Sequence, residues 1–294
     1  MADLSVGVVV ISHNEGDRLT RTVEGLLATL PSGARVVVVD DHSTDGSVAS
    51  LPHDERLTIR RPAVRLGVAG ARNYGVLELG CDVLVFSDAH VDVSSDWWDP
   101  LVSALADPAV GAVAPSVVAM GEPSWKGWGM TWSDAALNVE WLPYPGDAPV
   151  GVPMLCGCFL AMRREVFERC GGFDDGLFRW GAEDLELSLR LWTLGYQCLV
   201  VPEVEVAHLF RERFPYEISP QSVLANLVRV AIVHLTGPRL AAVVSCLRLQ
   251  EHFPAAVADV LDGDASQRAI QVRSQRVHDD AWYIDRFAIR FDRP

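Results

Sequence analysis

The sequence predicts an α/β fold in which a mostly parallel mixed sheet is flanked by helices, with a helical extension at the C-terminus. Short continuous apolar runs such as "RVVVVDD" (35–41) lack the alternation of a half-exposed strand, which indicates strands buried on both faces. Segments with helical spacing separate these runs, as the crossovers of parallel strands require. With 294 residues, 49% hydrophobic and 22% charged, the chain can bury a sizeable core in one or two domains.

The first ninety residues predict alternating strands and helices. The run 6–12 is rich in β-branched residues and predicts a strand, and the apolar residues of 19–30 recur at helical spacing until Pro31 and Gly33 end the helix. Further strands are predicted at 35–41, 57–61 and 81–88, with a helix at 69–79 before the last of them. The carboxyl ends of such strands form the edge where α/β sheets bind ligands.

Beyond residue 92 the pattern is less regular. We expect a helix from Trp97 and a strand at 111–120, and then a Gly-, Pro- and Trp-rich stretch at 121–152 that is long enough for a mobile loop or lid. A strand at 157–164 and a helix at 182–195 follow. The apolar segment 222–249 is interrupted by charged residues, Gly and Pro, so it predicts two packed helices; a dimer or membrane-surface contact is the alternative.

The composition excludes some classes of partner. A net charge of −14 and a pI near 4.9 argue against a nucleic-acid partner, which needs clustered Lys and Arg. The six cysteines have no regular spacing, which predicts reduced structural thiols. The N-terminal segment resembles neither a leader nor a membrane span, so we expect a cytoplasmic protein.

Polar clusters follow three of the predicted strands: "SHNEGD", "DDHSTDG" and "SDAH". In the last cluster Asp88 and His90 are two residues apart, so both side chains lie on one side of an extended chain. A carboxylate with an imidazole suits manganese, zinc or iron better than calcium. The spacing alone is also compatible with a strand-end cap and a surface histidine.

Two later segments carry further candidate groups. "RWGAEDLELSLRLW" places Glu183 and Asp184 at the start of a helix, where one carboxylate could act as a base or both could complement the helix dipole. "VEVAHLFR" places His208 at the end of an extended segment, as a ligand or as a partly buried structural histidine.

Taken in order, "SHNEGD", "VVVDDHSTDG", "GVAGARNYG", "FSDAH", "GGFDDGLFRWGAEDLELSLRLW" and "VAHLFR" resemble the family-two nucleotide-sugar glycosyltransferases of the GT-A (Rossmann-like) fold. The resemblance is closest to the catalytic domain of polypeptide N-acetylgalactosaminyltransferases and to chondroitin-polymerase-like enzymes. It implies a catalytic domain at 1–211, with a nucleotide-binding half at about 1–92 and an acceptor half at about 93–211. Residues 212–294 would form a mostly helical extension, through which a homodimer could form.

The resemblance implies a metal and a donor site. Asp88, His90 and His208 would ligate a divalent ion, most readily Mn2+ with Mg2+ as the alternative, which would bridge the phosphates of a UDP-sugar. Asp41 matches an aspartate that hydrogen-bonds the uracil, and His13 matches a residue that packs on the base. The same resemblance places Glu15 and Arg72 near the nucleotide and the donor.

The resemblance also implies catalytic groups. Asp184 matches the general base of inverting members, and Glu183 would orient the acceptor or the donor sugar. The polypeptide transferases, which retain the anomeric configuration, typically have Glu-Asn at this position, so Asp184 favours inversion whereas the DxH motif and "AHLFR" favour the retaining group. Trp180 and Arg211 are candidates for contacts with the acceptor.

The expected function is metal-dependent transfer of a hexose or N-acetylhexosamine from a UDP-sugar to a hydroxyl group of a small molecule, glycan or peptide. The first alternative is a retaining Ser/Thr N-acetylgalactosaminyltransferase-like enzyme. The second is a non-catalytic subunit that binds sugar nucleotides. A nucleotidyltransferase is disfavoured because "SHNEGDRLTR" has no lysine of the kind that a phosphate-binding loop carries.

Overall fold

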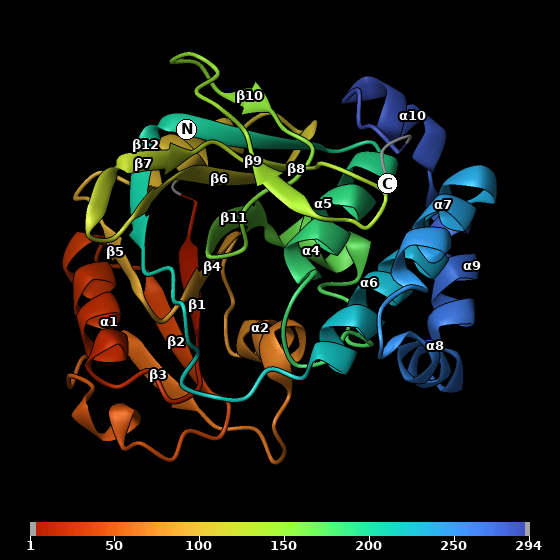
Figure 1. Ribbon diagram of the computed structural model, residues 1–294. Helices are drawn as coiled ribbons and strands as arrows, with labels where there is room; N and C mark the ends of the chain where they lie inside the picture. Colours follow the sequence, from red (N-terminus) through yellow and green to blue (C-terminus); the bar gives the residue numbers. More distant parts are fainter. Residues whose placement is uncertain (1–3, 292–294) are drawn as a thin grey trace.

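A ten-stranded mixed sheet forms the centre of the protein in this computed structural model, which describes residues 4–291 (Figure 1). The strand order is β10-β12-β6-β11-β4-β1-β2-β3, with β5 paired to β12 and β7 paired to β6. The strands are β1 (Val6–Ser12), β2 (Arg35–Asp40), β3 (Leu57–Arg60), β4 (Val83–Asp88), β5 (Val91–Val93), β6 (Val110–Ala119), β7 (Glu122–Gly127), β10 (Val150–Gly151), β11 (Phe159–Arg163) and β12 (Gln197–His208). A separate two-stranded sheet pairs β8 (Met130–Trp132) with β9 (Val139–Trp141).

The N-terminal half is the parallel part of the sheet. Strand β1 pairs in parallel with β2 and β4, and β2 with β3. The crossovers include α1 (Asp17–Thr29), the short 3₁₀ helix η1 (Ser47–Ser50) and α2 (Gly67–Val76). Helix α2 lies so close to the sheet that a Cβ on Gly75 would lie 2.4 Å from Val9 Cγ1. These elements confirm the strands and helices expected for the first ninety residues.

The remaining strands extend the sheet with mixed polarity. Strand β11 is antiparallel to both β4 and β6, whereas β12 runs parallel to β6. The register of β12 against β6 shifts between Val201 and Glu205, and the end of β12 then pairs with β5, where His208 lies opposite Val91. Strand β12 therefore brings its last residue beside the segment that follows β4. Helices α3 (Trp98–Ala104), α4 (Arg164–Cys170) and α5 (Glu183–Thr193) pack around this half.

The Trp-rich stretch 121–152, expected to be a mobile loop or lid, contains regular strands. It contains β7, β8, β9 and β10, and Trp132 is only 2% exposed. Trp125 packs against Trp141 and Phe210, with ring centroids 5.2 Å and 5.1 Å away. Aromatic packing and strand pairing order this segment, and its role as a lid stays a prediction.

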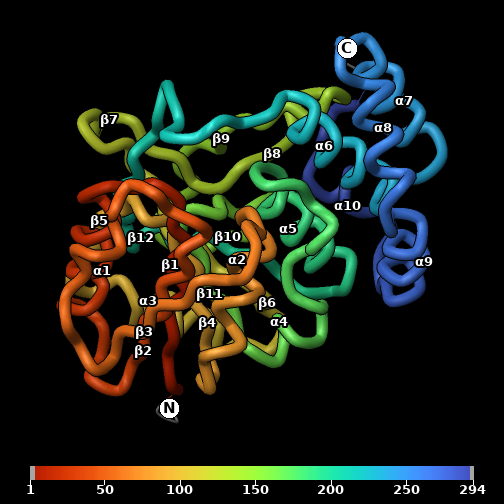
Figure 2. Tube along the Cα trace, turned by 90° about the horizontal axis from the view of Figure 1, so that it is seen from below, coloured from red at the N-terminus to blue at the C-terminus, as the bar shows by residue number. Residues whose placement is uncertain are grey.

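Five helices form the C-terminal part and lie together beside α5 at one side of the molecule (Figures 1 and 2). They are α6 (Pro220–His234), α7 (Gly237–Leu247), α8 (Phe253–Asp262), α9 (Ala265–Gln275) and α10 (Asp280–Arg286). The pair α6 and α7 confirms the two packed helices expected for 222–249. Within residues 4–291, no helix combines the length and the apolar character needed to cross a membrane.

A buried ion cluster joins α5 to α6. Glu186 accepts hydrogen bonds from Arg190, at 2.8 and 2.7 Å, and lies 2.8 Å from His234 Nε2. The three side chains are at most 1% exposed. Burial opposes the ionisation of Glu186, but the Arg190 charge and the His234 hydrogen bond outweigh it and hold the pKa of this carboxyl well below its usual range. The helical extension and the preceding domain therefore share a buried polar contact.

Candidate functional site

A cavity of about 360 Å³ opens where β1, β2, β4 and β12 end. Its wall includes residues that follow β1 and β2, together with the segment between β4 and β5 and the segment that follows β12. This confirms the expectation that polar clusters after three strands meet at one edge of the sheet. The cavity is lined by Ile11, Ser12, His13, Glu15, Asp41, Arg65, Gly67, Val68, Ala71, Asp88, Ala89, His90, Arg179, Trp180, Glu183, His208, Leu209, Phe210, Arg211, Phe214 and Tyr216.

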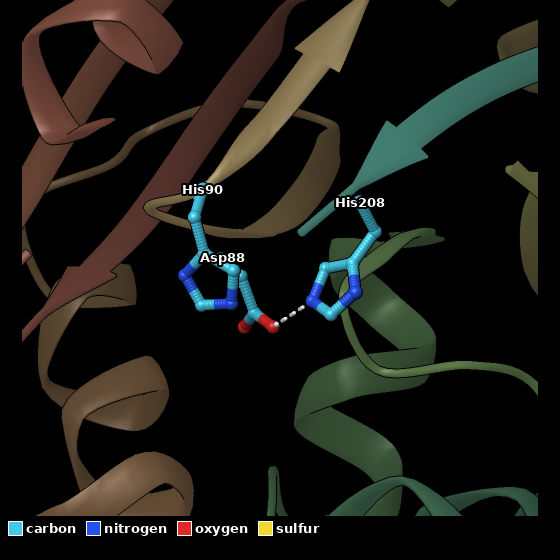
Figure 3. A group of neighbouring side chains, drawn as sticks. All are labelled: Asp88, His90 and His208. Carbon is cyan, nitrogen blue, oxygen red and sulfur yellow. Dashed lines mark ion pairs between the residues drawn. The ribbon is translucent and has the colours of Figure 1, made fainter. Parts of the chain in front are cut away.

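Figure 3 shows that the side chains of Asp88, His90 and His208 converge, and all three residues line this cavity. One potential ligand atom from each residue lies within 4.8 Å of the other two. Backbone pairing sets the arrangement, because the Asp88 N–H donates to the Cys158 carbonyl at 2.9 Å and the Leu209 N–H donates to the His90 carbonyl at 3.1 Å. The predicted trio is thus assembled by the end of β4, the segment between β4 and β5, and the end of β12.

The charges around Asp88 keep it ionised. Burial opposes ionisation, but the hydrogen bond with His208 and the charges of Arg72 and His90 lower the pKa of Asp88 well below its usual range. His208 Nε2 lies 3.4 Å from Asp88 Oδ2, while the buried His208 Nδ1 has no hydrogen-bond partner among the described residues. A carboxylate and two imidazoles fit a divalent transition metal such as manganese.

Glu15 and Arg211 lie beside the trio and contact each other. The Arg211 guanidinium donates to both carboxylate oxygens of Glu15, and Glu15 Oε2 lies 3.1 Å from His90 Nδ1. Burial alone would raise the pKa of Glu15. The hydrogen bonds from His90 and Arg211 have the larger, opposite effect, so the pKa lies below its ordinary value. The ligand contacts predicted for Glu15 and Arg211 stay predictions, since in this structure the two side chains pair together at the cavity wall.

His13 and Asp41 lie on the wall next to the start of α2. Both oxygens of Asp41 accept backbone N–H bonds, from Leu66 at 2.6 Å and from Gly67 at 2.9 Å. His13 Nδ1 lies 2.7 Å from the Asp41 carbonyl oxygen. Burial and the nearby Arg65 charge lower the pKa of His13, which favours a neutral ring. The structure brings both residues to the cavity, and their contacts with a base stay predictions.

Arg72 is not among the residues that line the cavity. It is 1% exposed and lies behind the wall, where it donates to Glu183 Oε1 and Asp88 Oδ1, each at 3.2 Å, and to the Gly157 carbonyl at 2.6 Å. The place expected for Arg72, near the nucleotide and the donor, stays a prediction, and in this structure the side chain reaches the cavity only through Asp88 and Glu183. A buried guanidinium links a candidate metal ligand to the carboxylate at the start of α5.

The adjacent carboxylates Glu183 and Asp184 differ in their placement. Glu183 lines the cavity, and burial together with the charge of Asp184 raises its pKa to about 7. Asp184 is absent from the wall, because its oxygens accept the N–H groups of Gly157 and Leu185, both at 2.9 Å. Burial also raises the pKa of Asp184 against the effect of these hydrogen bonds. The role of general base expected for Asp184 stays a prediction, and Glu183 is the carboxylate that faces the cavity.

Four further residues line the cavity that sequence reasoning missed: Arg65, Arg179, Phe214 and Tyr216. The Phe214 ring packs against the predicted Trp180 at 5.2 Å, and Tyr216 packs against His13 at the same distance. Burial and the charges of Asp88 and Glu15 raise the pKa of Tyr216. The signal was the short aromatic sequence "FPY" directly after "HLFRER", within an irregular segment that has no periodicity.

Curated proteins of similar sequence include transferases. A curated relative in Caenorhabditis elegans, "Probable N-acetylgalactosaminyltransferase 8", is 31% identical over 258 residues and aligns with 78% of this chain and 61% of its own length. "Polypeptide N-acetylgalactosaminyltransferase 8" of Drosophila melanogaster is 34% identical over 228 residues, which are 71% of this chain and 38% of its own length. The chain thus spans about half the length of the curated relatives it matches.

Solved structures confirm the predicted GT-A fold. The crystal structure of GalNAc-T7 with UDP, GalNAc and Mn2+ superposes with a TM-score of 0.80 at 24% identity, over 97% of this chain and 56% of that chain. A mannosyltransferase from Pyrobaculum calidifontis in complex with GDP-Man and Mn2+ gives a TM-score of 0.56 at 20% identity, over 97% and 83% of the two chains.

Two family descriptions match the sequence itself. "N-terminal domain of galactosyltransferase" matches residues 146–213, which include Glu183, Asp184 and His208. "Glycosyl transferase family 2" matches residues 7–171, more than half of the 294-residue chain, including Asp88 and His90. The family profiles, the fold and the arrangement of the cavity agree, and the chain belongs to glycosyl transferase family 2.

Proposed function

We propose that this chain is a metal-dependent glycosyltransferase that moves a hexose or N-acetylhexosamine from a UDP-sugar to a hydroxyl group of an acceptor. The convergence of Asp88, His90 and His208 on one side of the cavity carries the proposal. Relatives named as N-acetylgalactosaminyltransferases and a similar fold crystallised with UDP and Mn2+ support it.

The site offers distinct places for a metal and a nucleotide. Asp88, His90 and His208 would hold the ion, and a divalent metal bound there would neutralise the charge that develops on the departing nucleoside diphosphate. The ion pair of Arg211 with Glu15 lies beside this position and orients both side chains. His13, Asp41 and Tyr216 form the part of the wall where a base could pack and form hydrogen bonds.

We assign the acid–base or orienting role at the start of α5 to Glu183. It faces the cavity, and a pKa of about 7 suits proton transfer near neutral pH. Asp184, the base expected for an inverting reaction, is held by backbone N–H groups away from the wall. This arrangement favours the retaining alternative, and the names of the relatives point the same way. The anomeric proton of the product, observed by NMR during the first turnovers, distinguishes the two courses.

The relatives also suggest a class of acceptor. Two of them are named as N-acetylgalactosaminyltransferases and one of these as a polypeptide transferase, so a Ser or Thr hydroxyl of a peptide is the second candidate acceptor beside a glycan or small molecule. A panel of Ser/Thr peptides and glycans, tested with the donor that binds, decides among them.

The test of the proposed function is binding of UDP and UDP-sugars in the presence of Mn2+. We expect micromolar to millimolar affinity that EDTA abolishes, followed by slow donor hydrolysis or transfer to an acceptor. Asp88→Ala and His208→Ala should each weaken metal-dependent UDP binding at least tenfold, because each removes one candidate ligand. Unchanged Mn2+-dependent affinity in both variants would refute the metal assignment. Tight binding with no turnover for any donor would favour the non-catalytic alternative.

A further inference from the structure

The short segment 178–182 forms part of the cavity wall in a strained backbone conformation. Arg179, Gly181 and Ala182 have positive φ values of 23°, 97° and 69°. Two of these are not glycine, and such a conformation persists only where surrounding contacts hold it. The segment presents Trp180 to the cavity and leads directly into Glu183 at the start of α5.

Asn226 of α6 holds this segment from behind. Its side chain is fully buried, and its Oδ1 accepts the Phe178 N–H at 2.7 Å. Its Nδ2 donates to the carbonyl oxygens of Phe178, Trp180 and Gly181, at 2.8, 3.0 and 2.9 Å. One buried amide therefore makes hydrogen bonds to three of the five residues in the segment.

The opposite side of the segment rests on the start of α2. The Val68 N–H donates to the Arg179 carbonyl at 2.8 Å, and a Cβ placed on Gly67 would lie 2.6 Å from Arg179 Cα. Gly67 also donates its N–H to Asp41 on the cavity wall. The segment is thus held between the nucleotide-binding half and the helical extension.

We infer that Asn226 is a positioning residue, which holds segment 178–182 so that Trp180 and Glu183 face the cavity. The inference rests on the proposed function for its effect on turnover. It places α6, which lies beyond the predicted catalytic domain 1–211, among the elements that shape the reacting site. Asn226 contacts the backbone of the segment and not the cavity, so it acts on the reaction through Trp180 and Glu183.

A purely structural role for Asn226 makes different predictions. It would lower the stability of the fold, and turnover would fall only as far as the folded fraction falls. Val228→Ala is the matched control, because Val228 is a buried residue of the same helix, 3% exposed, with an apolar side chain that cannot hydrogen-bond the segment. Substitution of either Val228 or Asn226 removes buried contacts of α6, but only substitution of Asn226 removes the hydrogen bonds to segment 178–182.

The experiment compares Asn226→Leu and Asn226→Asp with Val228→Ala. We expect both Asn226 variants to lower kcat at least tenfold, with the donor and acceptor found by the binding screen, while the Kd for UDP with Mn2+ changes less than threefold. Val228→Ala should keep kcat within twofold at equal folded fraction. A loss of kcat in the Asn226 variants no larger than in Val228→Ala would overturn the inference.

Amide hydrogen exchange provides a readout that does not depend on activity. In the wild-type chain the Phe178 N–H, which donates to Asn226, should exchange at least a hundredfold more slowly than in an unstructured peptide, and amides of 178–184 should exchange at least tenfold faster in the Asn226 variants than in Val228→Ala. If the wild-type chain binds no UDP, the proposed function fails and exchange still decides the role of Asn226. An unprotected Phe178 N–H in the wild type would overturn the inference even if no variant folds.

Discussion

At the scale of single residues, adjacent carboxylates take different roles because their surroundings differ. Glu183 and Asp184 are neighbours in sequence, but only Glu183 reaches the cavity, while backbone N–H groups fix Asp184. Sequence reasoning could locate the pair at a helix start from the "GAED" pattern. It could not say which carboxylate faces the ligand, because that depends on how Gly157 of a distant loop approaches the first turn of α5.

The two carboxylates give the first residue-scale prediction. Glu183→Gln should lower kcat by about 100-fold, the size expected for loss of a proton-transfer group, with little change in UDP affinity. Asp184→Asn should cost less than tenfold, because one amide oxygen can still accept the Gly157 N–H. Steady-state kinetics with the selected donor measure both values. A larger loss in Asp184→Asn than in Glu183→Gln would return the role of base to Asp184.

At the scale of elements, the sequence pattern predicts secondary structure correctly where a segment is regular. It fails where contacts between distant segments determine the structure. The apolar runs of β1, β2 and β4 show their type in sequence because both faces are covered. The spacing of Asp88 and His90 places both on one side of an extended chain, but only the resemblance to a family indicated a metal site. The strands of 121–152 were missed, since Trp and Gly give no period and their order comes from packing onto Phe210. Tyr216 was missed because it also lies in a segment without periodicity.

The contact between α5 and α6 gives an element-scale prediction. Glu186→Ala leaves the Arg190 guanidinium buried without its partner carboxylate, so the free energy of unfolding should fall by about 3–5 kcal/mol. Glu168→Ala is the control, because this glutamate is exposed and its i,i+4 pair with Arg164 lies at the surface. Urea unfolding followed by circular dichroism measures both. Equal, small effects for the two variants would show that the buried cluster contributes little to stability.

At the scale of the whole molecule, the C-terminal helices and the GT-A sheet are connected by buried polar contacts. The boundary predicted at residue 211 marks the last motif of the family and not a break in packing, since Glu186 contacts His234 and Asn226 holds the segment before α5. Sequence alone could not show this, because helices such as α6 carry no motif and their partners are fixed only in three dimensions. Asp280 ties the last of these helices to the connection between α6 and α7.

The contacts of Asp280 predict a pH dependence of stability. Burial raises the pKa of this carboxyl, but hydrogen bonds from Arg239 and Thr236 lower it below the ordinary value of 3.8. A lowered pKa in the folded state stabilises the fold above pH 3.8, and that contribution is lost as the pH falls through the folded-state pKa. Asp280→Asn should therefore lower the free energy of unfolding by about 2 kcal/mol at pH 7 and by progressively less below pH 4.

Urea unfolding at pH 7, 3.5 and 2.5 measures the difference between wild type and Asp280→Asn, because the predicted loss occurs only below pH 3.8. Asp285→Asn, on the same helix and solvent-exposed, is the control and should show no such trend. A difference that is constant over this range would mean that the charge of Asp280 does not contribute to stability.

The register shift in β12 has a consequence for insertions and deletions. Between Val201 and Glu205 the strand slips relative to β6, and it then continues to His208 beside β5. Side chains of a strand alternate between its faces, so a strand shorter or longer by one residue would turn His208 to the opposite face. The length of β12 therefore determines on which face of the strand His208, the third candidate ligand, lies. Insertion or deletion of one residue within β12 should abolish metal-dependent UDP binding even where the sheet still forms.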